Sequence, residues 1–467
     1  MLATSTYPNY QPVRSRWVKR VPDHWRLLRA KNFLREIDDR TKTGEETLLS
    51  MRQHRGLVPH NDVSAKHIAP QNLIGYKKAQ PDELVLNRMQ AGNAMFFRNR
   101  LLGLVSPDYA VFRLLRDDSP EYLGFLFRSW PMRGLFRSES KGLGTGTSGF
   151  LRLYSDRFAA LEIPLPPSTE QDQIVAYLRA QDAHIARFIK AKRDLIGLLT
   201  EQKLRIIDHA VTRGLDSSVE LKPSGIEWLG DIPLHWDARK LKFVTKRIVG
   251  GSTPKSDEPR HWEGDVVWVT PKDVSKTDLL NSSLRTITRE GLRSCSSTLV
   301  PAGSIVITSR APVGNVAIAG VDLCTNQGCK AIVPATEIMI SDYLFLLILR
   351  MKERLQVLAN GTTFAEIGTS VLANEFVPLP PVSEQVMICR RIEDECRPVN
   401  EAIARAEAEI KLIREYRDRQ IADVVTGQVD VRGWVPSPDD VVAEEDLTAL
   451  GGDEEIDTDG EEEHGDD

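Results

Sequence analysis

Six short polar loops hold the residues whose types and spacing could do recognition chemistry. Three lie in the first half of the chain and three in the second, at residues 50–56, 87–93, 144–149, 250–256, 309–315 and 360–364. Arginine can pair bidentately with guanine, and glutamine or asparagine with adenine, whereas serine, threonine and lysine suit phosphates. The loops therefore predict contact with nucleic acid, against the alternative of solvated loop tips.

We take the polar residues in and near these loops as candidate DNA-binding residues, each weighed against simple exposure to solvent. They are Arg52, Gln53, Arg55, Lys66, Arg88, Gln90, Asn93, Thr145, Thr147, Ser148, Ser252, Thr253, Lys255, Lys272, Arg310, Asn315, Thr362 and Thr363.

The sequence lacks the motifs of the catalysts that act on DNA. A nuclease would need clustered acids to hold magnesium, and a methyltransferase would need a Gly-rich cofactor loop with Asn or Asp before Pro-Pro-Tyr or Pro-Pro-Phe. The Gly-rich stretch 142–149 lacks the lysine of a phosphate-binding loop. Five cysteines at irregular spacings indicate neither a disulfide framework nor a zinc site. We therefore expect no catalytic residues, no metal ligands and no cofactor in this chain.

Charge is distributed unevenly along the chain. Residues 435–467 hold fifteen Asp and Glu and no Lys or Arg, so residues 1–434 carry 61 basic against 51 acidic residues, a surplus of ten. The basic part suits a polyanionic partner, and the acidic tail has too little apolar content to fold, so we expect it to be disordered. The longest apolar run, residues 343–349, is too short to span a membrane, and no export signal is visible. These features predict a cytoplasmic protein.

The chain repeats itself at an offset of more than 200 residues. Trp17, Pro22, His24 and Trp25 match Trp228, Pro233, His235 and Trp236, and LEIPLPPSTEQ at 161–171 matches EFVPLPPVSEQ at 375–385. Val211-Thr212 matches Val425-Thr426, and SPEYLGFLF at 119–127 matches ISDYLFLLI at 340–348. Anchors in the same order indicate two structural copies, and so long a period excludes a solenoid or a propeller.

Each copy ends in a long helix. Apolar residues recur at three- and four-residue steps from Ile174 through Leu178, Ile185, Phe188, Leu195 and Leu199 to Ile206, and from Ile392 through Cys396, Val399, Ile403, Ala406 and Ile410 to Ile413. This spacing predicts coiled-coil helices at 168–215 and 382–430, with Pro398 marking a kink or a late start. Because the second globular copy must connect the end of the first helix to the start of the second, we expect the helices to run antiparallel.

The remaining segments predict two globular domains, at 15–167 and 216–381. Short β-rich runs such as 109–112, 265–270 and 304–308 are bounded by Gly, Pro and Asn, and the clearest helices begin at Ser119 and Ser341. We expect an α/β fold in each domain, with a curved, mainly antiparallel sheet, and pseudo-two-fold symmetry between the domains. The acidic tail occupies 435–467.

These motifs together resemble the specificity subunits of type I restriction–modification systems. The resemblance rests on the WxxxxPxxW start, LSMRQHRG (49–56) and VSPDY (105–109), GSTP (251–254) and WVTPKD (268–273), the PLPP-x-x-EQ junctions and the repeated helices. It covers about residues 15–430 and leaves the acidic tail unaccounted for. The globular domains are thus identified as target-recognition domains.

The resemblance implies a non-catalytic protein that binds double-stranded DNA at a bipartite target. Each target-recognition domain would read one half-site, and the helices would set the spacing between them and carry two modification subunits. The partners would supply S-adenosylmethionine for adenine methylation, and restriction subunits would use ATP and magnesium for translocation and cleavage. Two alternatives are an adaptor that binds only proteins and a self-sufficient DNA methyltransferase.

Overall fold

The structure is a computed structural model that describes residues 6–53, 55–64, 66–143, 150–359, 366–440, 447, 450 and 451. The chain divides into two units: unit 1 comprises Met1–Leu195 with Ala406–Asp467, and unit 2 comprises Ile196–Arg405. Two long helices, α4 (Ser168–Arg213) and α10 (Val382–Val425), contribute to both units. The predicted domain boundaries stay predictions.

Unit 1 contains a globular domain whose main sheet is antiparallel and four-stranded, in the order β4-β11-β8-β9. Its strands are β1 (Tyr10–Pro12), β2 (Arg20–Pro22), β3 (Arg26–Arg29), β4 (Leu34–Ile37), β5 (Leu49–Arg52), β6 (Gly56–Pro59), β7 (Lys77–Ala79), β8 (Leu84–Asn87), β9 (Phe96–Arg98), β10 (Gly103–Val105), β11 (Tyr109–Leu114), β12 (Lys141–Leu143), β13 (Phe150–Arg152) and β14 (Glu162–Leu165). Its shorter helices are α1 (Pro120–Arg128), α2 (Trp130–Glu139) and α3 (Ser155–Ala160).

Unit 2 contains a second domain with a five-stranded sheet in the order β18-β25-β22-β23-β20. Its strands are β15 (Leu221–Pro223), β16 (Asp231–Pro233), β17 (Asp237–Lys240), β18 (Thr245–Gly250), β19 (Trp262–Val269), β20 (Leu279–Leu280), β21 (Arg285–Ile287), β22 (Ile305–Thr308), β23 (Val316–Ala319), β24 (Leu323–Thr325), β25 (Cys329–Pro334) and β26 (Phe376–Leu379). Its shorter helices are α5 (Pro271–Val274), α6 (Arg289–Ser294), α7 (Ser341–Arg350), α8 (Lys352–Leu358) and α9 (Thr369–Asn374).

The two domains share one connectivity, which confirms the repeat read from the sequence. Each strand of the unit 1 sheet has a counterpart at the same sheet position in unit 2: β4 corresponds to β18, β8 to β22, β9 to β23 and β11 to β25. In each domain an early strand then pairs antiparallel with the strand before the long helix, β3 with β14 and β17 with β26. Most pairs are antiparallel, as expected, whereas β19 with β24 and β20 with β23 are parallel. The sheet curvature stays a prediction.

Local sequence explains the elements that were predicted. The run at 109–112 lies in β11, and those at 265–270 and 304–308 largely form the end of β19 and β22. Ser119 caps α1, with its hydroxyl accepting from the Tyr122 backbone, and α7 begins at Ser341. The long helices end earlier than predicted, at Arg213 and Val425, because Gly214 and Gly427 adopt positive φ angles of 75° and 72°.

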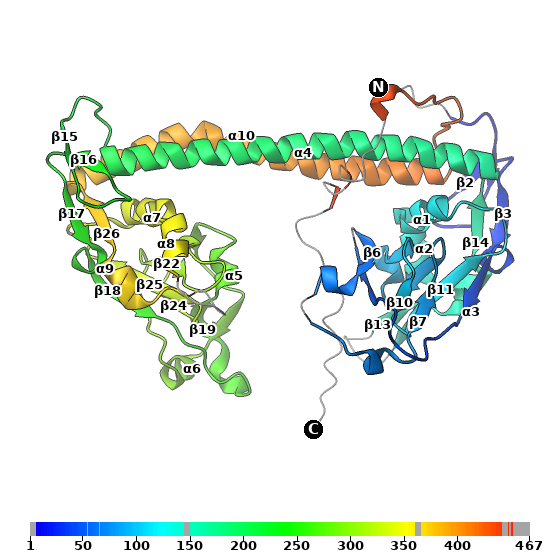
Figure 1. Cartoon of the computed structure of the whole chain (residues 1–467), viewed down its shortest axis with the longest axis horizontal. Coiled ribbons are helices and arrows are strands. Elements are labelled where there is room, and N and C mark those ends of the chain that lie inside the picture. Colours follow the sequence, from blue (N-terminus) through cyan, green and yellow to red (C-terminus); the bar gives the residue numbers. More distant parts are fainter. Residues whose placement is uncertain are drawn as a thin grey trace. The chain divides into compact units, whose positions relative to one another are not determined.

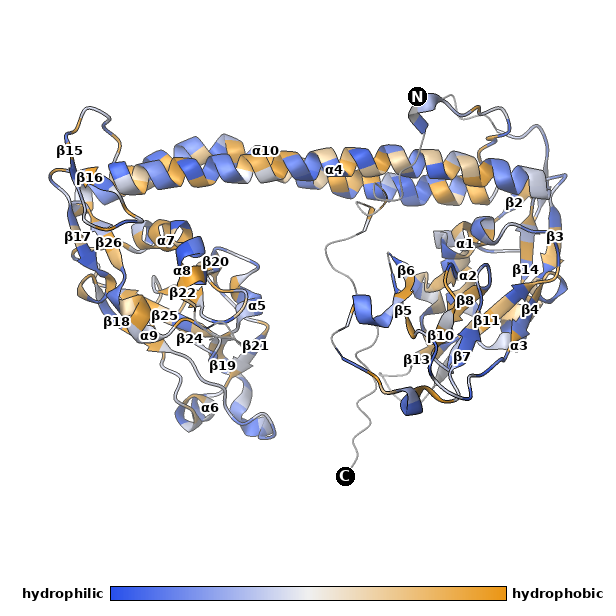
Figure 2. Ribbon diagram, in the orientation of Figure 1, coloured by the Kyte–Doolittle hydropathy of each residue, from blue (hydrophilic) through white to orange (hydrophobic). Residues whose placement is uncertain are grey.

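The core of unit 1 runs from the sheet into the long helices, whose alternation of apolar and polar residues is visible in Figure 2. Phe96 stacks on Phe127 with ring centroids 4.6 Å apart, and Phe112 and Phe158 close the same aromatic cluster. Tyr122, Ile174 and Val424 belong to this core and are essentially inaccessible. The domain is therefore fixed to the helices by shared hydrophobic packing.

Helices α4 and α10 run antiparallel in each unit, and we call them the helix pair (Figure 1). In unit 1, Asp182 of α4 accepts two hydrogen bonds from Arg417 of α10 at 2.6 and 2.8 Å, while Lys192 pairs with Glu409. In unit 2, a Cβ on Gly214, just past the end of α4, would lie 3.2 Å from Glu384 near the start of α10. Residue numbers thus rise along one helix as they fall along the other.

The sequence predicts a row of buried apolar residues along each long helix, which we call the apolar seam. This prediction is right for part of each helix. Ile174, Leu178 and Ile185 are buried, but Phe188 and Leu195 are 40% and 41% exposed, so assigning them to the seam was wrong. Ala186 and Ile189 are buried instead, because the seam advances from Ile185 by four residues rather than three. Helix α10 begins at Val382 and continues past Pro398, which excludes a late start there.

The Asp182–Arg417 pair gives a test of this packing. Replacing Asp182 with alanine leaves a largely buried guanidinium without its carboxylate, and we expect a loss of about 2–4 kcal/mol in unfolding free energy. Glu201→Ala serves as the control, because the Glu201–Arg205 pair is exposed and should contribute less than about 0.5 kcal/mol. Urea denaturation measures both changes, and equal small losses would show that the buried pair does not hold the helices.

Candidate nucleic-acid interface

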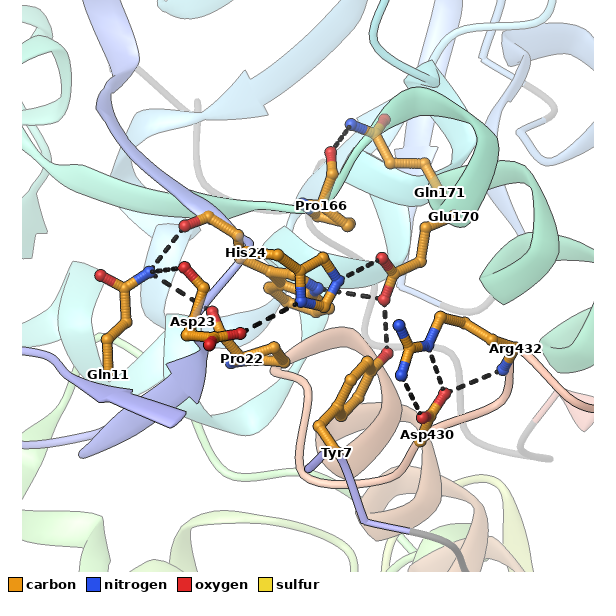
Figure 3. A network of polar contacts seen from close by, with 11 residues as sticks. Tyr7, Gln11, Pro22, Asp23, His24, Pro166, Glu170, Gln171, Asp430 and Arg432 are labelled. Carbon is orange, nitrogen blue, oxygen red and sulfur yellow. Dashed lines mark hydrogen bonds and ion pairs between the residues drawn. The ribbon is translucent and has the colours of Figure 1, made fainter. Parts of the chain in front are cut away.

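A buried carboxylate in unit 1 joins the repeated Trp motif to the start of α4 (Figure 3). Glu170 accepts hydrogen bonds from the Tyr7 hydroxyl at 2.6 Å and the Trp25 indole at 3.0 Å, and its other oxygen lies 2.7 Å from His24 Nε2. Burial, together with the bond to Glu170, holds the pKa of Tyr7 well above its ordinary value. The hydroxyl therefore remains a donor at neutral pH.

Unit 2 repeats the arrangement with the matching residues. Glu384, near the start of α10, accepts from the Trp236 indole at 3.0 Å and lies 2.9 Å from His235 Nε2. The side chain of Glu384 is 19% exposed against 6% for Glu170. We call each Glu–His–Trp set a carboxylate latch, because one carboxylate ties the beginning of a domain to a long helix.

The glutamine after each latch carboxylate fixes a second connection. Gln171 accepts from the Ser119 backbone at 2.7 Å and donates to the Pro166 carbonyl at 3.0 Å, which joins the start of α1 to the Pro-rich junction. Gln385 makes the matching bonds to Ile340 and Pro380, both at 3.0 Å. The PLPP-x-x-EQ motif is thus a structural joint, which supports reading its prolines as a junction rather than a catalytic motif.

Tyr and Val-Thr occur in the same order in both copies of the repeat, and the structure gives a reason for this. The hydroxyl of Tyr122 in α1 donates to the carbonyl of Val425 at the end of α10, at 3.0 Å. Tyr343 in α7 donates in the same way to Val211 near the end of α4, also at 3.0 Å. Burial raises the pKa of both tyrosines well above the ordinary value. Each domain therefore contacts the start of one long helix and the end of the other.

The two latches allow a matched comparison. Glu170→Ala should cost about 3 kcal/mol, because it leaves the buried Tyr7 hydroxyl and Trp25 indole without an acceptor. Glu384→Ala should cost about 1–2 kcal/mol, because among the described residues no tyrosine joins its latch and the carboxylate is more exposed. The free energies come from chemical denaturation followed by tryptophan fluorescence. An equal loss in the two variants, or none in Glu170→Ala, would contradict this account of the latch.

In unit 2 the candidate loops converge on the turn between β24 and β25. The Ser252 backbone donates to the Thr325 carbonyl at 3.0 Å, and the Thr253 hydroxyl donates to the Gln327 side chain. The Ser309 backbone donates to Gly328 at 2.8 Å, which brings Arg310 alongside. Only glycine fits at 251, where a Cβ would lie 2.1 Å from the Asn326 carbonyl oxygen. Ser252, Thr253 and Arg310 therefore share one polar surface.

A neighbouring group extends this surface. The Thr270–Asp273 capping box sets the short helix α5, on which Lys272 is exposed. Asn315 donates to Ser275 just after α5 at 3.0 Å and accepts from Lys352 at 2.9 Å. Arg310 is 47% exposed and donates to Glu366 at 2.9 Å. Lys255 is exposed, and its carbonyl accepts from the Trp262 indole at 3.0 Å.

In unit 1 the candidates fall into two groups. Arg52, Gln53 and Arg55 belong to the β5–β6 hairpin, where Arg55 is exposed but Arg52 is only 3% exposed. Arg128, at the end of α1, donates to the Gln53 carbonyl at 3.2 Å and lies over the Phe97 ring. Arg52 thus supports the hairpin from within, while Arg55 faces solvent.

The second group lies on the 3-10 segment Arg88–Asn93, after β8. Arg88 donates to Glu36 and, at 2.9 Å, to Ser155, so its guanidinium is engaged inside the domain. Gln90 is half-buried, and the exposed Asn93 accepts from Arg137 at 3.3 Å. Lys66 is exposed after the hairpin. The remaining candidates, Thr145, Thr147, Ser148, Thr362 and Thr363, lie outside the described residues.

Sequence reasoning missed the turn residues at the centre of the unit 2 surface. Asn326 is half-buried and Gln327 exposed, and both carry amides that can pair with adenine. The turn at the same sheet position in unit 1 holds Ser106 and Asp108, with Asp108 3.3 Å from Arg152. The polar segment TNQG between two strands could have indicated a candidate turn from the sequence. Only the fold shows which loops surround that turn.

The described residues hold no group of three His, Cys, Asp or Glu side chains that could bind a metal ion. Burial raises the pKa of Cys324, Cys329 and Cys389 to about 12, so these thiols stay protonated near neutral pH. In the part of the chain that is described, no helix is long and apolar enough to cross a membrane.

Comparison with known proteins gives one consistent family. Residues 233–412 match the family described as the type I restriction modification DNA specificity domain. The type I restriction enzyme MjaIX specificity subunit of Methanocaldococcus jannaschii is 39% identical over 164 residues, which cover 34% of this chain and 38% of that protein. The putative MjaX specificity subunit of the same organism is 27% identical over 317 residues, covering 67% of this chain and 69% of the relative.

The fold agrees with these matches. A solved chain from a study of complex assembly and conformational transition of the type I R-M system covers 88% of this chain with a TM-score of 0.57, at 18% identity. This likeness supports the fold, with two α/β domains of one connectivity and long helices. The sequence matches agree with one another, and the chain is similar to type I restriction–modification specificity subunits.

Proposed function

We propose that this chain binds double-stranded DNA at a bipartite target, with one half-site read by each unit. The observation that carries the proposal is the convergence of the unit 2 loops on the Asn326–Gly328 turn, where hydroxyls, amides and the partly exposed Arg310 share a surface. Amides and guanidinium groups read base edges, while hydroxyls and lysines such as Lys272 hold phosphates. The name of the family supports the same role.

A second domain of the same connectivity supports the two-part target. The latches and the Tyr122 and Tyr343 bonds tie each domain to the helix pair, so the helices would set the number of unread bases between the half-sites. The repeated residues hold the domains on the helices, so the loop sequences can differ between the units without disturbing that attachment. Different loops would read different bases.

The helix pair would also carry the partner subunits. Large apolar side chains are exposed on both long helices: Phe188, Leu195, Leu198, Leu204, Leu412 and Tyr416. Exposed apolar patches commonly mark protein interfaces. Two modification subunits would bind here and bring S-adenosylmethionine for adenine methylation, and restriction subunits would bring ATP- and magnesium-dependent cleavage. This chain would itself be non-catalytic and act in the cytoplasm, where its DNA lies.

Selection from random duplexes tests the proposal, and substitutions in matching turns sharpen it. The chain should enrich two short motifs separated by a fixed unread gap. Gln327→Ala should relax one motif at one or two positions, with a loss of about 1–3 kcal/mol for the original base, and leave the other motif intact. Asp108→Ala, in the matching turn of unit 1, should leave the motif read by unit 2 unchanged.

The outcomes separate this function from its rivals. Loss of both motifs on Gln327→Ala would contradict independent reading by the two units. No enrichment of any sequence at low salt would favour an adaptor that binds only proteins.

The lone-methyltransferase alternative has its own test. Purified chain, DNA and labelled S-adenosylmethionine should give no methyl transfer above background, because the sequence carries neither a cofactor loop nor a catalytic Pro-Pro motif. Transfer should appear only after modification subunits are added. Stoichiometric labelling of DNA by the chain alone would show that it is a complete enzyme.

A further inference from the structure

Glu366 lies beside Arg310 on the polar surface of unit 2, and backbone contacts fix both residues there. The amides of Ser309 and Arg310 donate to the Gly328 carbonyl at 2.8 and 3.4 Å. The Ile367 amide donates to the Ser309 carbonyl at 2.9 Å. Arg310 and Glu366 themselves form an isolated antiparallel β-bridge. The two side chains therefore start from neighbouring backbones next to the β24–β25 turn.

A buried cation pairs with the same carboxylate. Lys330 of β25, whose side chain is 8% exposed, has its Nζ 3.7 Å from Glu366 Oε1. Because Lys330 stands opposite Ile307 of β22, its backbone position is set by the sheet. Arg310 Nε donates to the other oxygen, Oε2, at 2.9 Å. The two cations use different oxygens, so the carboxylate can pair with Lys330 and still accept from Arg310.

The bond to Glu366 involves only one edge of the Arg310 guanidinium. It uses Nε, and among the described residues no hydrogen bond engages the two Nη groups. A guanidinium is a planar, rigid fork of donors, and this side chain is 47% exposed. Two parallel donors of such a fork match the O6 and N7 acceptors of guanine in the major groove. An arginine held at Nε therefore presents a pair of donors that suits guanine.

An acid at a DNA-binding surface needs a reason. Glu366 repels phosphates, so it weakens non-specific binding to DNA. Its ion pair with Arg310 is partly exposed on both sides, and such pairs contribute little to the free energy of unfolding. Holding the guanidinium in one orientation, however, reduces the conformational entropy that a contact with a base would otherwise remove. Orientation of Arg310 therefore explains the acid better than stability does.

We propose that Glu366 is a positioning residue, which holds Arg310 at Nε and directs its Nη edge to a guanine in the half-site read by unit 2. The proposal rests on the proposed DNA-binding function and adds the base that one side chain selects. Lys330 pairs with the carboxylate and keeps it in place. Arg310 makes the contact, and Glu366 acts through Arg310.

The experiment compares full-length variants by selection from random duplexes and by affinity for selected and random DNA. Arg310→Ala should remove the preference for guanine at one position of one motif, with a loss of about tenfold or more in discrimination. Glu366→Ala should reduce the same preference about fivefold, whereas its affinity for random DNA at low salt should stay equal or rise, because an acid has been removed. Glu366→Gln should keep most of the preference, since its amide oxygen still accepts from Nε.

Glu337→Ala is the matched control. Glu337 is an exposed acid that pairs with Lys246 and follows the end of β25, whereas the β24–β25 turn precedes the start of that strand. Its removal changes the charge of unit 2 by the same amount. The guanine preference should therefore stay as in the natural chain.

The outcomes separate positioning from other roles. Tighter binding of selected and random DNA by Glu366→Ala, with the guanine preference intact, would overturn the proposal, because Glu366 would then only mask Arg310. A lower melting temperature of Glu366→Ala with unchanged preference would overturn it in favour of a structural role. A uniform loss of affinity in Arg310→Ala, with a salt dependence weaker by about one charge, would overturn it in favour of a phosphate contact. Absence of any two-part motif with the natural chain would instead refute the proposed function.

Discussion

One carboxylate per unit, buried at Glu170 and partly buried at Glu384, ties a domain to the long helices. Glu170 and Glu384 sit at the starts of the long helices and accept from an indole and a histidine that come about 150 residues earlier in the chain. Burying a carboxylate costs free energy unless its oxygens accept hydrogen bonds. The Glu therefore needs the Trp and His as hydrogen-bond donors, and the Trp and His need the Glu as their acceptor. The neighbouring Gln171 and Gln385 extend the constraint to α1 in unit 1 and α7 in unit 2. The most visible motif of the sequence is therefore a joint.

This constraint separates the positions that must stay fixed from those that can vary. In each unit, the latch and the neighbouring glutamine fasten the domain to the helix pair beside an antiparallel strand pair, β3–β14 in unit 1 and β17–β26 in unit 2. The larger sheet of each domain carries the loops. In unit 2 these loops meet around the β24–β25 turn, where the close approach of Gly251 to the Asn326 carbonyl oxygen limits the backbone. Side chains such as Thr253 and Gln327 can change without disturbing the latch.

The sequence predicted the features that depend on local pattern. The long helices, the repeat, the antiparallel direction and several strands follow from spacing over a few residues or from connectivity. Phe188 and Leu195 were misplaced because a three-residue and a four-residue step look alike in sequence, and only packing against α10 selects one. The candidate site was predicted as a set of loops but not as a surface. Arg52 resembles a base-reading arginine, yet the hairpin folds it inward, and Gln327 owes its position to Thr253, 74 residues away.

The most direct test of the whole account is a missing-nucleoside interference map of the natural chain on its preferred duplex. The account predicts two clusters of bases whose removal abolishes binding, divided by a stretch where removal has no effect. Exchanging the loops of unit 2 should move only one cluster. A single continuous cluster of essential bases would contradict the claim that two latched domains read the duplex separately.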